Sequence, residues 1–130
     1  MSLSPKVIVI GPPTVGKTCL VQRIVNNSFS PDYKVTLGVD FFQKKYVYHQ
    51  GERLNTLWYH FWDIAGQDYY SKMVHSFYMN AAACLMVCDL SLENIFTDIK
   101  QWYEEVSRKV LLNSGKRVPT ILVCNKIDLP

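Results

Sequence analysis

The segment near the amino terminus, residues 11–18 with the sequence GPPTVGKT, carries the first candidate chemistry. It matches the pattern G-x-x-x-x-G-K-[ST], in which backbone N–H groups surround phosphate oxygens at the start of a helix. Lys17 is then expected to reach the β- and γ-phosphates, and the Thr18 hydroxyl to ligate Mg²⁺. Pro12 and Pro13 have no N–H, so the phosphate donors are expected to be Thr14, Gly16, Lys17 and Thr18. This segment predicts a site for a nucleoside phosphate with a magnesium ion.

A second polar segment, residues 125–128 (NKID), follows an apolar run near the other end of the sequence. The carboxylate of Asp128 can accept two hydrogen bonds from guanine, which presents its ring N1–H and its exocyclic amine side by side. Adenine lacks this pair of donors and would leave the carboxylate unpaired. Asn125 can bond the base or tie loops together, and the stem of Lys126 can lie over the purine ring. Such residues also suit an ordinary polar turn, but their position after a phosphate-binding segment favours recognition of guanine.

Two segments between these motifs supply candidates for metal binding and hydrolysis. In residues 62–67 (WDIAGQ), Asp63 can act on Mg²⁺ through a water molecule, the Gly66 N–H can meet the γ-phosphate, and Gln67 can orient the attacking water. Thr36 could supply a second hydroxyl to the metal. Taken singly, Gln67 and Thr36 would be ordinary surface residues. Together with the two motifs they predict a nucleotide hydrolase, with Gln67 and Lys17 as its candidate catalytic residues.

The hydrophobic pattern predicts the elements that must position these segments. Apolar runs without polar alternation are typical of buried parallel strands, and aromatic and β-branched residues around a polar turn indicate a hairpin. The expected strands are residues 6–10, 39–48, 54–62, 81–88 and 118–124. Helical spacing of apolar residues predicts a helix at 17–25 and a longer one that Ser91 caps and Gly115 follows. With a further helix before residue 81, this order predicts a doubly wound α/β sheet that binds ligands at the carboxyl ends of its strands.

Length and composition indicate one globular domain, residues 1–130. Hydrophobic residues make up 48% of the chain and aromatic residues 13%, which excludes a disordered chain. The net charge of +3 is small and scattered, so we expect no nucleic-acid partner. No apolar run has the length of a membrane span, and the first residues resemble no secretory signal, so a cytoplasmic protein is expected. Four cysteines in apolar segments are expected to be reduced core thiols: Cys19, Cys84, Cys88 and Cys124.

The motifs together resemble those of a known family. Residues 11–18, Thr36, residues 63–67 and residues 125–128 are similar to the first four conserved motifs of Ras-superfamily small GTPases. Further segments are similar to those that mark the Rab branch, namely residues 37–41, 62–67, 77–81 and 86–91. The resemblance implies a P-loop NTPase G domain with three α/β/α layers and an antiparallel edge hairpin. It also implies a switch in vesicle trafficking that binds GTP or GDP with Mg²⁺ and hydrolyses GTP slowly. Its implied partners are effector, exchange-factor and GTPase-activating proteins, and its implied location is the surface of endomembranes.

The same resemblance assigns roles to residues that the motifs alone do not identify. It implies that Phe29 packs against guanine, that Tyr33 closes over the phosphates, and that Val15 and Cys19 belong to the nucleotide site. It also implies an aromatic triad that effectors read, with core packing as the alternative for its members Phe41, Trp62 and Phe77.

The family continues beyond the position of Pro130 with a further helix, a strand, a last helix and a prenylated tail. The chain is therefore expected to be an excerpt that lacks the last strand and helix, with membrane attachment only through the absent tail. A truly truncated chain would expose apolar strand surface and could dimerise. Two other classes of function remain open at this point: an interaction module of the same shape that holds nucleotide poorly, and a nucleotide kinase.

Overall fold

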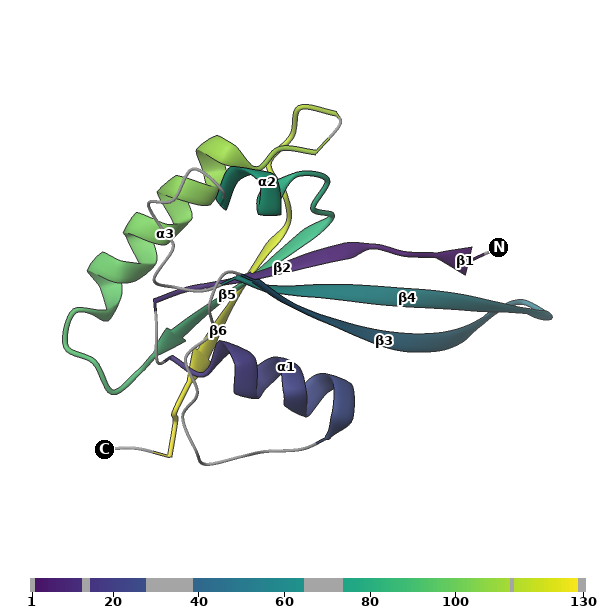
Figure 1. The fold of residues 1–130 in the computed structure, drawn as a ribbon, viewed down its shortest axis with the longest axis horizontal. Helices are drawn as coiled ribbons and strands as arrows, with labels where there is room; N and C mark the ends of the chain where they lie inside the picture. The colour runs from purple at the N-terminus through teal and green to yellow at the C-terminus, as the bar shows by residue number, and fades with distance from the viewer. Residues whose placement is uncertain (1, 13–14, 28–38, 65–73, 113, 129–130) are drawn as a thin grey trace.

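The computed structural model describes residues 2–12, 15–27, 39–64, 74–112 and 114–128 (Figure 1). Strands and helices alternate along the chain in the predicted order, preceded by a two-residue strand. The elements are β1 (Ser2–Leu3), β2 (Lys6–Ile10), α1 (Lys17–Asn26), β3 (Val39–Gln50), β4 (Arg53–Ile64), α2 (Val74–Tyr78), β5 (Ala83–Asp89), α3 (Ile95–Lys109) and β6 (Thr120–Asn125). Among the described residues, no helix combines the length and apolar character that crossing a membrane requires.

One mostly parallel sheet connects all the strands of the described segments, as predicted. In the sheet, β4 pairs in parallel with both β1 and β2, β2 pairs with β5, and β5 pairs with β6. The antiparallel partner of β4 is β3, in a register that runs from Val39↔Ile64 to Gln50↔Arg53. In the described part of the chain β3 has no other neighbour, so the predicted edge hairpin is confirmed. The strand β1 was not predicted, because two residues carry no periodicity.

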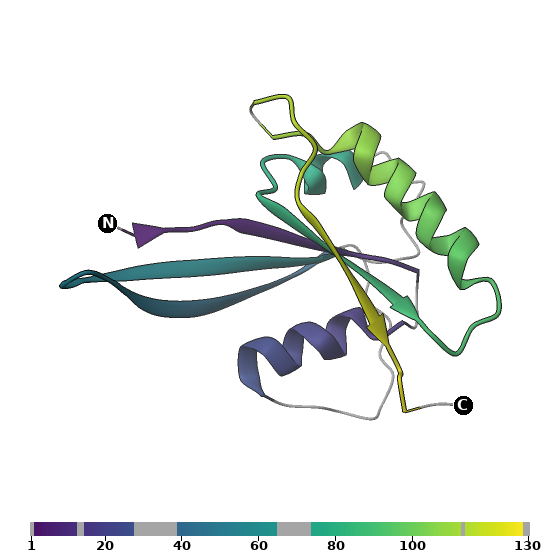
Figure 2. The same ribbon diagram turned by 180° about the vertical axis from the view of Figure 1, so that it is seen from behind.

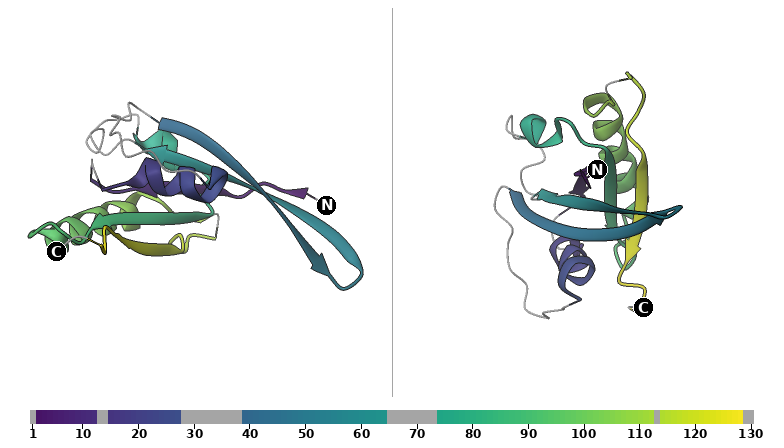
Figure 3. Two further views of the ribbon diagram at one scale, coloured as in Figure 1. Left: turned by 90° about the horizontal axis from the view of Figure 1, so that it is seen from below. Right: turned by 90° about the vertical axis from the view of Figure 1, so that its right-hand side faces the viewer.

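Helices cover both faces of this sheet and form the three predicted layers. One face carries α1 and the other carries α2 and α3, which Figures 1 and 2 show from opposite sides. Alternate residues of β2 supply both cores: Val7 and Val9 pack in the cluster that includes Val21 of α1, and Ile8 and Ile10 in the cluster that includes Trp102 of α3. This is why β2 reads as a continuous apolar run. The β3–β4 hairpin extends beyond the helices (Figure 3).

The ends of α3 differ from the prediction. The helix begins at Ile95 after Asn94, not after Ser91. Ser91 instead follows β5 in a turn, where its N–H and its hydroxyl both donate to Asp89 Oδ1, at 2.9 and 2.6 Å. Gly115 does not end the helix either: α3 ends at Lys109, and Gly115 lies with φ +81° in the turn before β6. A side chain bonded to Asp89 cannot cap a helix four residues later, so the capping prediction was wrong.

The prediction of four core thiols was correct only in part. Cys84 and Cys88 of β5 are buried, Cys19 of α1 is partly buried, and Cys124 of β6 is exposed. The reason is the position of β6, which pairs only with β5 in the described part of the chain and leaves several of its apolar side chains in contact with solvent.

Candidate nucleotide-binding site

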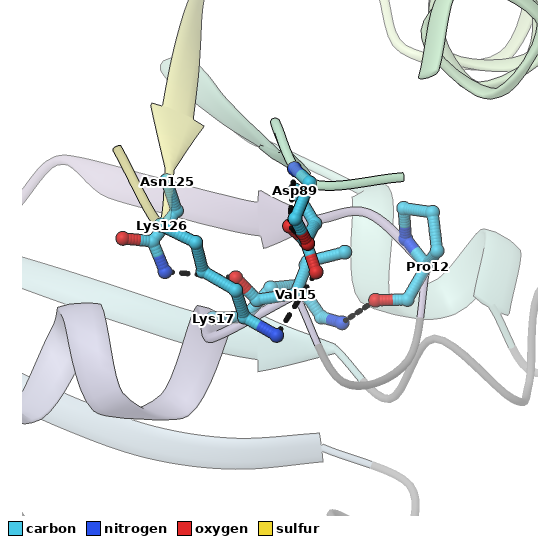
Figure 4. Close-up of polar contacts among 7 residues, drawn as sticks. Pro12, Val15, Lys17, Asp89, Asn125 and Lys126 are labelled. Atoms are coloured by element: carbon cyan, nitrogen blue, oxygen red, sulfur yellow. Dashed lines mark hydrogen bonds and ion pairs between the residues drawn. The ribbon is translucent and has the colours of Figure 1, made fainter. Parts of the chain in front are cut away.

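The carboxyl ends of three parallel strands bring the two sequence motifs together. The segment that follows β2 leads into α1, β5 ends at Asp89, and β6 ends at Asn125. Parallel strands end at the same edge of a sheet, so these segments meet although they lie far apart in the sequence. Figure 4 shows the side chains of Lys17, Asn125 and Lys126 converging there.

The first motif forms the start of α1. The helix begins at Lys17, and Gly16 before it has φ +97°, in the left-handed region that favours glycine. The Lys17 side chain is 6% exposed, and its Nζ donates to the Pro12 carbonyl at 2.7 Å. Burial lowers the pKa of Lys17 to about 8, although the nearby charge of Asp63 opposes this shift. A buried cation at a helix N-terminus is suited to an anionic ligand such as a phosphate.

The second motif closes over the first. Asn125 Nδ2 donates to the Val15 carbonyl at 2.8 Å, across 110 positions of sequence (Figure 4). Of the two roles open to Asn125, the structure shows the one that ties loops together. Lys126 Nζ lies 2.9 Å from Asp89 Oδ2, and Asp128 is exposed beyond it. The motif residues 125–128 are therefore anchored on one side to the phosphate segment and on the other to the end of β5.

Gly16 cannot gain a side chain without breaking this connection. A Cβ atom on Gly16 would overlap Asn125 Nδ2, and φ +97° is strained for any other residue. We expect Gly16→Ala to reduce the free energy of unfolding in urea by at least about 2 kcal/mol. The matched control is Gly51→Ala in the hairpin turn, where φ is +64° and nothing lies within 4 Å of the added Cβ. Equal losses in the two variants would show that the Asn125 contact has no effect.

Asp63 and Thr18 form the candidate metal site. Thr18 Oγ1 donates to Asp63 Oδ2, and Asp63, at the end of β4, is fully buried. Its other oxygen, Oδ1, has no hydrogen-bond partner among the described residues. Burial raises the pKa of Asp63, against the opposing effects of the Thr18 hydrogen bond and the Lys17 charge. A buried carboxylate oxygen that lacks a partner, next to a hydroxyl, is the oxygen donor set that Mg²⁺ takes, so the residues fit this ion.

Asp89 belongs to the site but was not among the predicted residues. Its carboxylate holds Lys126 on one oxygen and Ser91 on the other. Burial alone would raise the pKa of Asp89, but the hydrogen bonds from Ser91 and the contact with Lys126 outweigh it and hold the pKa below its usual value. A signal was present in the sequence: an aspartate directly after a buried strand, with a serine two residues later, is typical of a side-chain-closed turn.

The depressed pKa of Asp89 predicts a loss of stability in acid. The unfolded chain takes up the proton first as the pH falls, so the stabilisation is present above the ordinary aspartate pKa and is lost as the pH falls through the lower folded value. We expect Asp89→Asn to unfold at lower urea concentration than the parent chain at pH 7. Between about pH 5 and pH 3 the variant should lose less stability than the parent. Parallel losses over this range would contradict the assignment to Asp89.

The remaining predicted site residues divide into two groups. Val15 is buried and Cys19 is partly buried, both beside the start of α1. The others lie outside the described residues, so their roles stay predictions: Thr14, Phe29, Tyr33, Thr36, Gly66 and Gln67.

The three aromatic residues lie in different environments. Phe41 of β3 is 62% exposed, and its ring meets that of Trp62 edge to face with centroids 4.6 Å apart. Trp62 and Phe77 are partly buried and pack against the core cluster beneath α3. The Nζ of Lys6 lies 3.5 Å from the centroid of the Trp62 ring and donates to the Met79 carbonyl. The alternative of core packing therefore applies to two of the three, while Phe41 faces solvent.

Comparison with known proteins agrees with this geometry. Residues 6–128 match the family model described as Roc, "Ras of Complex, Roc, domain of DAPkinase". The chain is 40% identical over 124 residues to the Ras-related protein Rab-7L1 of Rattus norvegicus, covering 95% of this chain and 59% of that protein. It is 37% identical over 123 residues to the Ypt/Rab-type GTPase YPT7 of Saccharomyces cerevisiae, covering 95% of this chain and 58% of the relative.

A plant relative shows the same pattern. The Ras-related protein RABG3a of Arabidopsis thaliana is 38% identical over 124 residues, with 95% of this chain and 58% of that protein covered. The chain thus spans about three-fifths of the length of these relatives. A family model that covers nearly the whole chain, Rab relatives at this identity, and the two motifs joined at one sheet edge agree with one another. The chain belongs to the Ras superfamily of small GTPases, in its Rab branch.

Proposed function

We propose that this chain is the nucleotide-binding part of a Rab-like switch that binds GTP and GDP with Mg²⁺ and hydrolyses GTP slowly. The observation that carries the proposal is the hydrogen bond from Asn125 Nδ2 to the Val15 carbonyl. It joins residues 125–128 to the segment before α1 at one edge of the sheet, which supports a single site in which the first would recognise guanine and the second would bind phosphate. If residues 125–128 were only a polar turn, Asn125 would not need to bond the segment before α1.

Four of the described residues would hold the nucleotide and its metal ion. Lys17 binds the terminal phosphates with its buried ammonium group, and Asp128, exposed at the end of the base motif, accepts hydrogen bonds from guanine. Thr18 would hold the Mg²⁺ ion with its hydroxyl, and Asp63 would hold it through a water molecule. When bound, Mg²⁺ neutralises charge on the β- and γ-phosphate oxygens.

Hydrolysis depends on orienting a water molecule beside the γ-phosphate. We assign this task to Gln67. The Gly66 N–H would contact the γ-phosphate and the Thr36 hydroxyl would contact the metal, and both contacts would be lost when the γ-phosphate leaves. The sequence places no arginine in the segments 33–38 and 62–67. An arginine from an activating partner would therefore stabilise the transition state, and turnover without that partner would be slow.

The proposed rate is measurable. We expect the purified chain to hydrolyse GTP on its own at about 10⁻⁴ to 10⁻² s⁻¹ in single-turnover assays with Mg²⁺. The control is Gln67→Leu, which should be slower still because it cannot orient water, with GTP affinity retained. Unaided turnover near about 1 s⁻¹ would contradict a switch that depends on a partner's arginine.

A simpler test separates the switch from a nucleotide-poor interaction module. Nucleotide extracted from the purified chain after denaturation should be GDP or GTP, identified by chromatography against standards. Adenine nucleotide would support a kinase-like reading instead. A chain that carries no nucleotide and shows no affinity for added GTP would support the interaction module.

The partners follow from the family. We propose that effector proteins contact the exposed ring of Phe41 and the Trp62 ring beneath it, and that exchange factors and activating proteins act on the nucleotide site. By the same likeness the full protein would act in vesicle trafficking on endomembranes.

A further inference from the structure

Two cysteines face each other beside the base motif. Cys88 of β5 and Cys124 of β6 are direct partners in the parallel pairing of these strands. The Cys88 thiol donates to Cys124 Sγ with the sulfur atoms 3.7 Å apart. Neighbouring strands lie about 4.8 Å apart, which is within the range of about 4.4–6.8 Å between the Cα atoms of disulfide-bonded residues. The two thiols can therefore be joined without separating the strands.

The two thiols differ in access to solvent. Cys124 is exposed, whereas Cys88 is only 3% exposed. Burial raises the pKa of Cys88 to about 11, and the contact with Cys124 and the charge of Asp89 add to this. A reagent in solution thus reaches Cys124 first, and Cys88 is held in place to react with whatever forms there.

The other buried thiol of β5 has no such partner. Cys84 is paired with Thr120 of β6, and burial raises its pKa to about 12 against the smaller effect of the Thr120 hydrogen bond. It lies on the same two strands as the cysteine pair, four positions earlier on each. Cys84 is therefore the matched control for reactivity that depends on a facing thiol.

We propose that Cys88 and Cys124 form a reversible dithiol–disulfide pair that responds to a small oxidised thiol such as glutathione disulfide. The Cys124 thiolate attacks one sulfur of glutathione disulfide, forms a mixed disulfide and releases one glutathione thiolate. Cys88, after losing its proton, attacks Cys124 Sγ, forms the Cys88–Cys124 bond and releases the second glutathione. The protein loses two electrons and two protons, which leave with two molecules of reduced glutathione.

The bond would act on the nucleotide site, an effect that depends on the proposed function. Asp89 and Asn125 directly follow the two cysteines and hold Lys126 and the Val15 carbonyl. In the described part of the chain β6 pairs only with β5, so local separation of these strands would release both anchors together. A disulfide between them suppresses this opening. The oxidised chain is therefore expected to release a bound guanine nucleotide more slowly, by about fivefold or more.

The chemical test does not depend on nucleotide. The chain is incubated with glutathione disulfide, the remaining thiols are alkylated, and peptides are mapped by mass spectrometry. We expect a peptide pair joined through Cys88 and Cys124, a loss of two hydrogen atoms in the intact mass, and full reversal by dithiothreitol. Cys88→Ser should stop at the mixed disulfide on Cys124, Cys124→Ser should form neither product, and Cys84→Ala should behave like the parent chain. A mixed disulfide on Cys124 that persists in the parent chain would overturn the proposal.

The functional test follows on the same samples. Release of a fluorescent guanine nucleotide is timed before oxidation, after oxidation and after reduction, in the parent chain and in Cys124→Ser. Slower release only in the cross-linked parent chain supports the coupling, and equal rates in fully cross-linked protein overturn it. A chain that forms the disulfide but binds no guanine nucleotide contradicts the proposed function while the cysteine pair stands.

Discussion

Lys17→Met is expected to lower the affinity of the chain for GTP by at least about a hundredfold, because it removes a buried charge from the phosphates. The ammonium group is already desolvated and is held by the Pro12 carbonyl, so little rearrangement is needed when phosphate binds. Methionine keeps most of the length and volume of the side chain. The measurement is a competition titration against a fluorescent guanine nucleotide, with Lys100→Met on the exposed face of α3 as the control.

The same variant separates binding from folding. Burial lowers the pKa of Lys17 to about 8, which means that the folded chain without nucleotide is destabilised by holding this charge. Lys17→Met should therefore unfold in urea at the same or a higher concentration than the parent chain when nucleotide is absent. A variant that loses both affinity and stability would show that Lys17 serves the fold, and GTP affinity equal to that of the Lys100 variant would remove Lys17 from the site.

Asp128→Asn is expected to reverse the preference of the chain between guanine and xanthine nucleotides. The amide loses one acceptor that guanine needs for its exocyclic amine and gains a donor that can meet the carbonyl group of xanthine at the same position. We expect GTP affinity to fall by at least about a hundredfold, with the xanthine nucleotide then bound more tightly than GTP. The measurement is a pair of competition titrations with the two triphosphates.

The control for this variant is Glu93→Gln, an acid-to-amide change at another exposed position. Because Asp128 is exposed as well, neither change should alter the free energy of unfolding, measured in urea, by more than about 0.5 kcal/mol. Unchanged guanine preference in Asp128→Asn would show that this carboxylate does not read the base.

A sequence pattern predicts the structure correctly where it reflects a strong local constraint. The bounds of β2 were predicted correctly as residues 6–10, because a strand buried on both faces is apolar along nearly its whole length, here residues 7–10. The hairpin was predicted for a similar reason, since polar residues 49–53 separate two runs of aromatic and β-branched side chains. The structure extends the first strand by two residues at its end, and the second strand by one residue at its start and two at its end.

Errors arose where a side chain had a choice of partners. Ser91 is a residue type that suits a helix cap, but its hydroxyl donates to Asp89, two residues before it in the turn, and the helix begins only four residues later. Cys124 lies in an apolar segment and was expected to be buried, but burial depends on which element lies beside the strand. Neither outcome is encoded in the few residues around the position.

The sequence alone was enough to recognise the motifs, because binding of phosphate, magnesium and guanine requires particular donors and acceptors in a particular order. Only the tertiary structure decided that these motifs lie together in one site. The contacts of Asn125 with Val15, of Lys126 with Asp89 and of Cys88 with Cys124 each join segments that are distant in the sequence. They exist because parallel pairing brings the ends of β2, β5 and β6 to one edge, and that register depends on the packing of the whole sheet rather than on any local pattern.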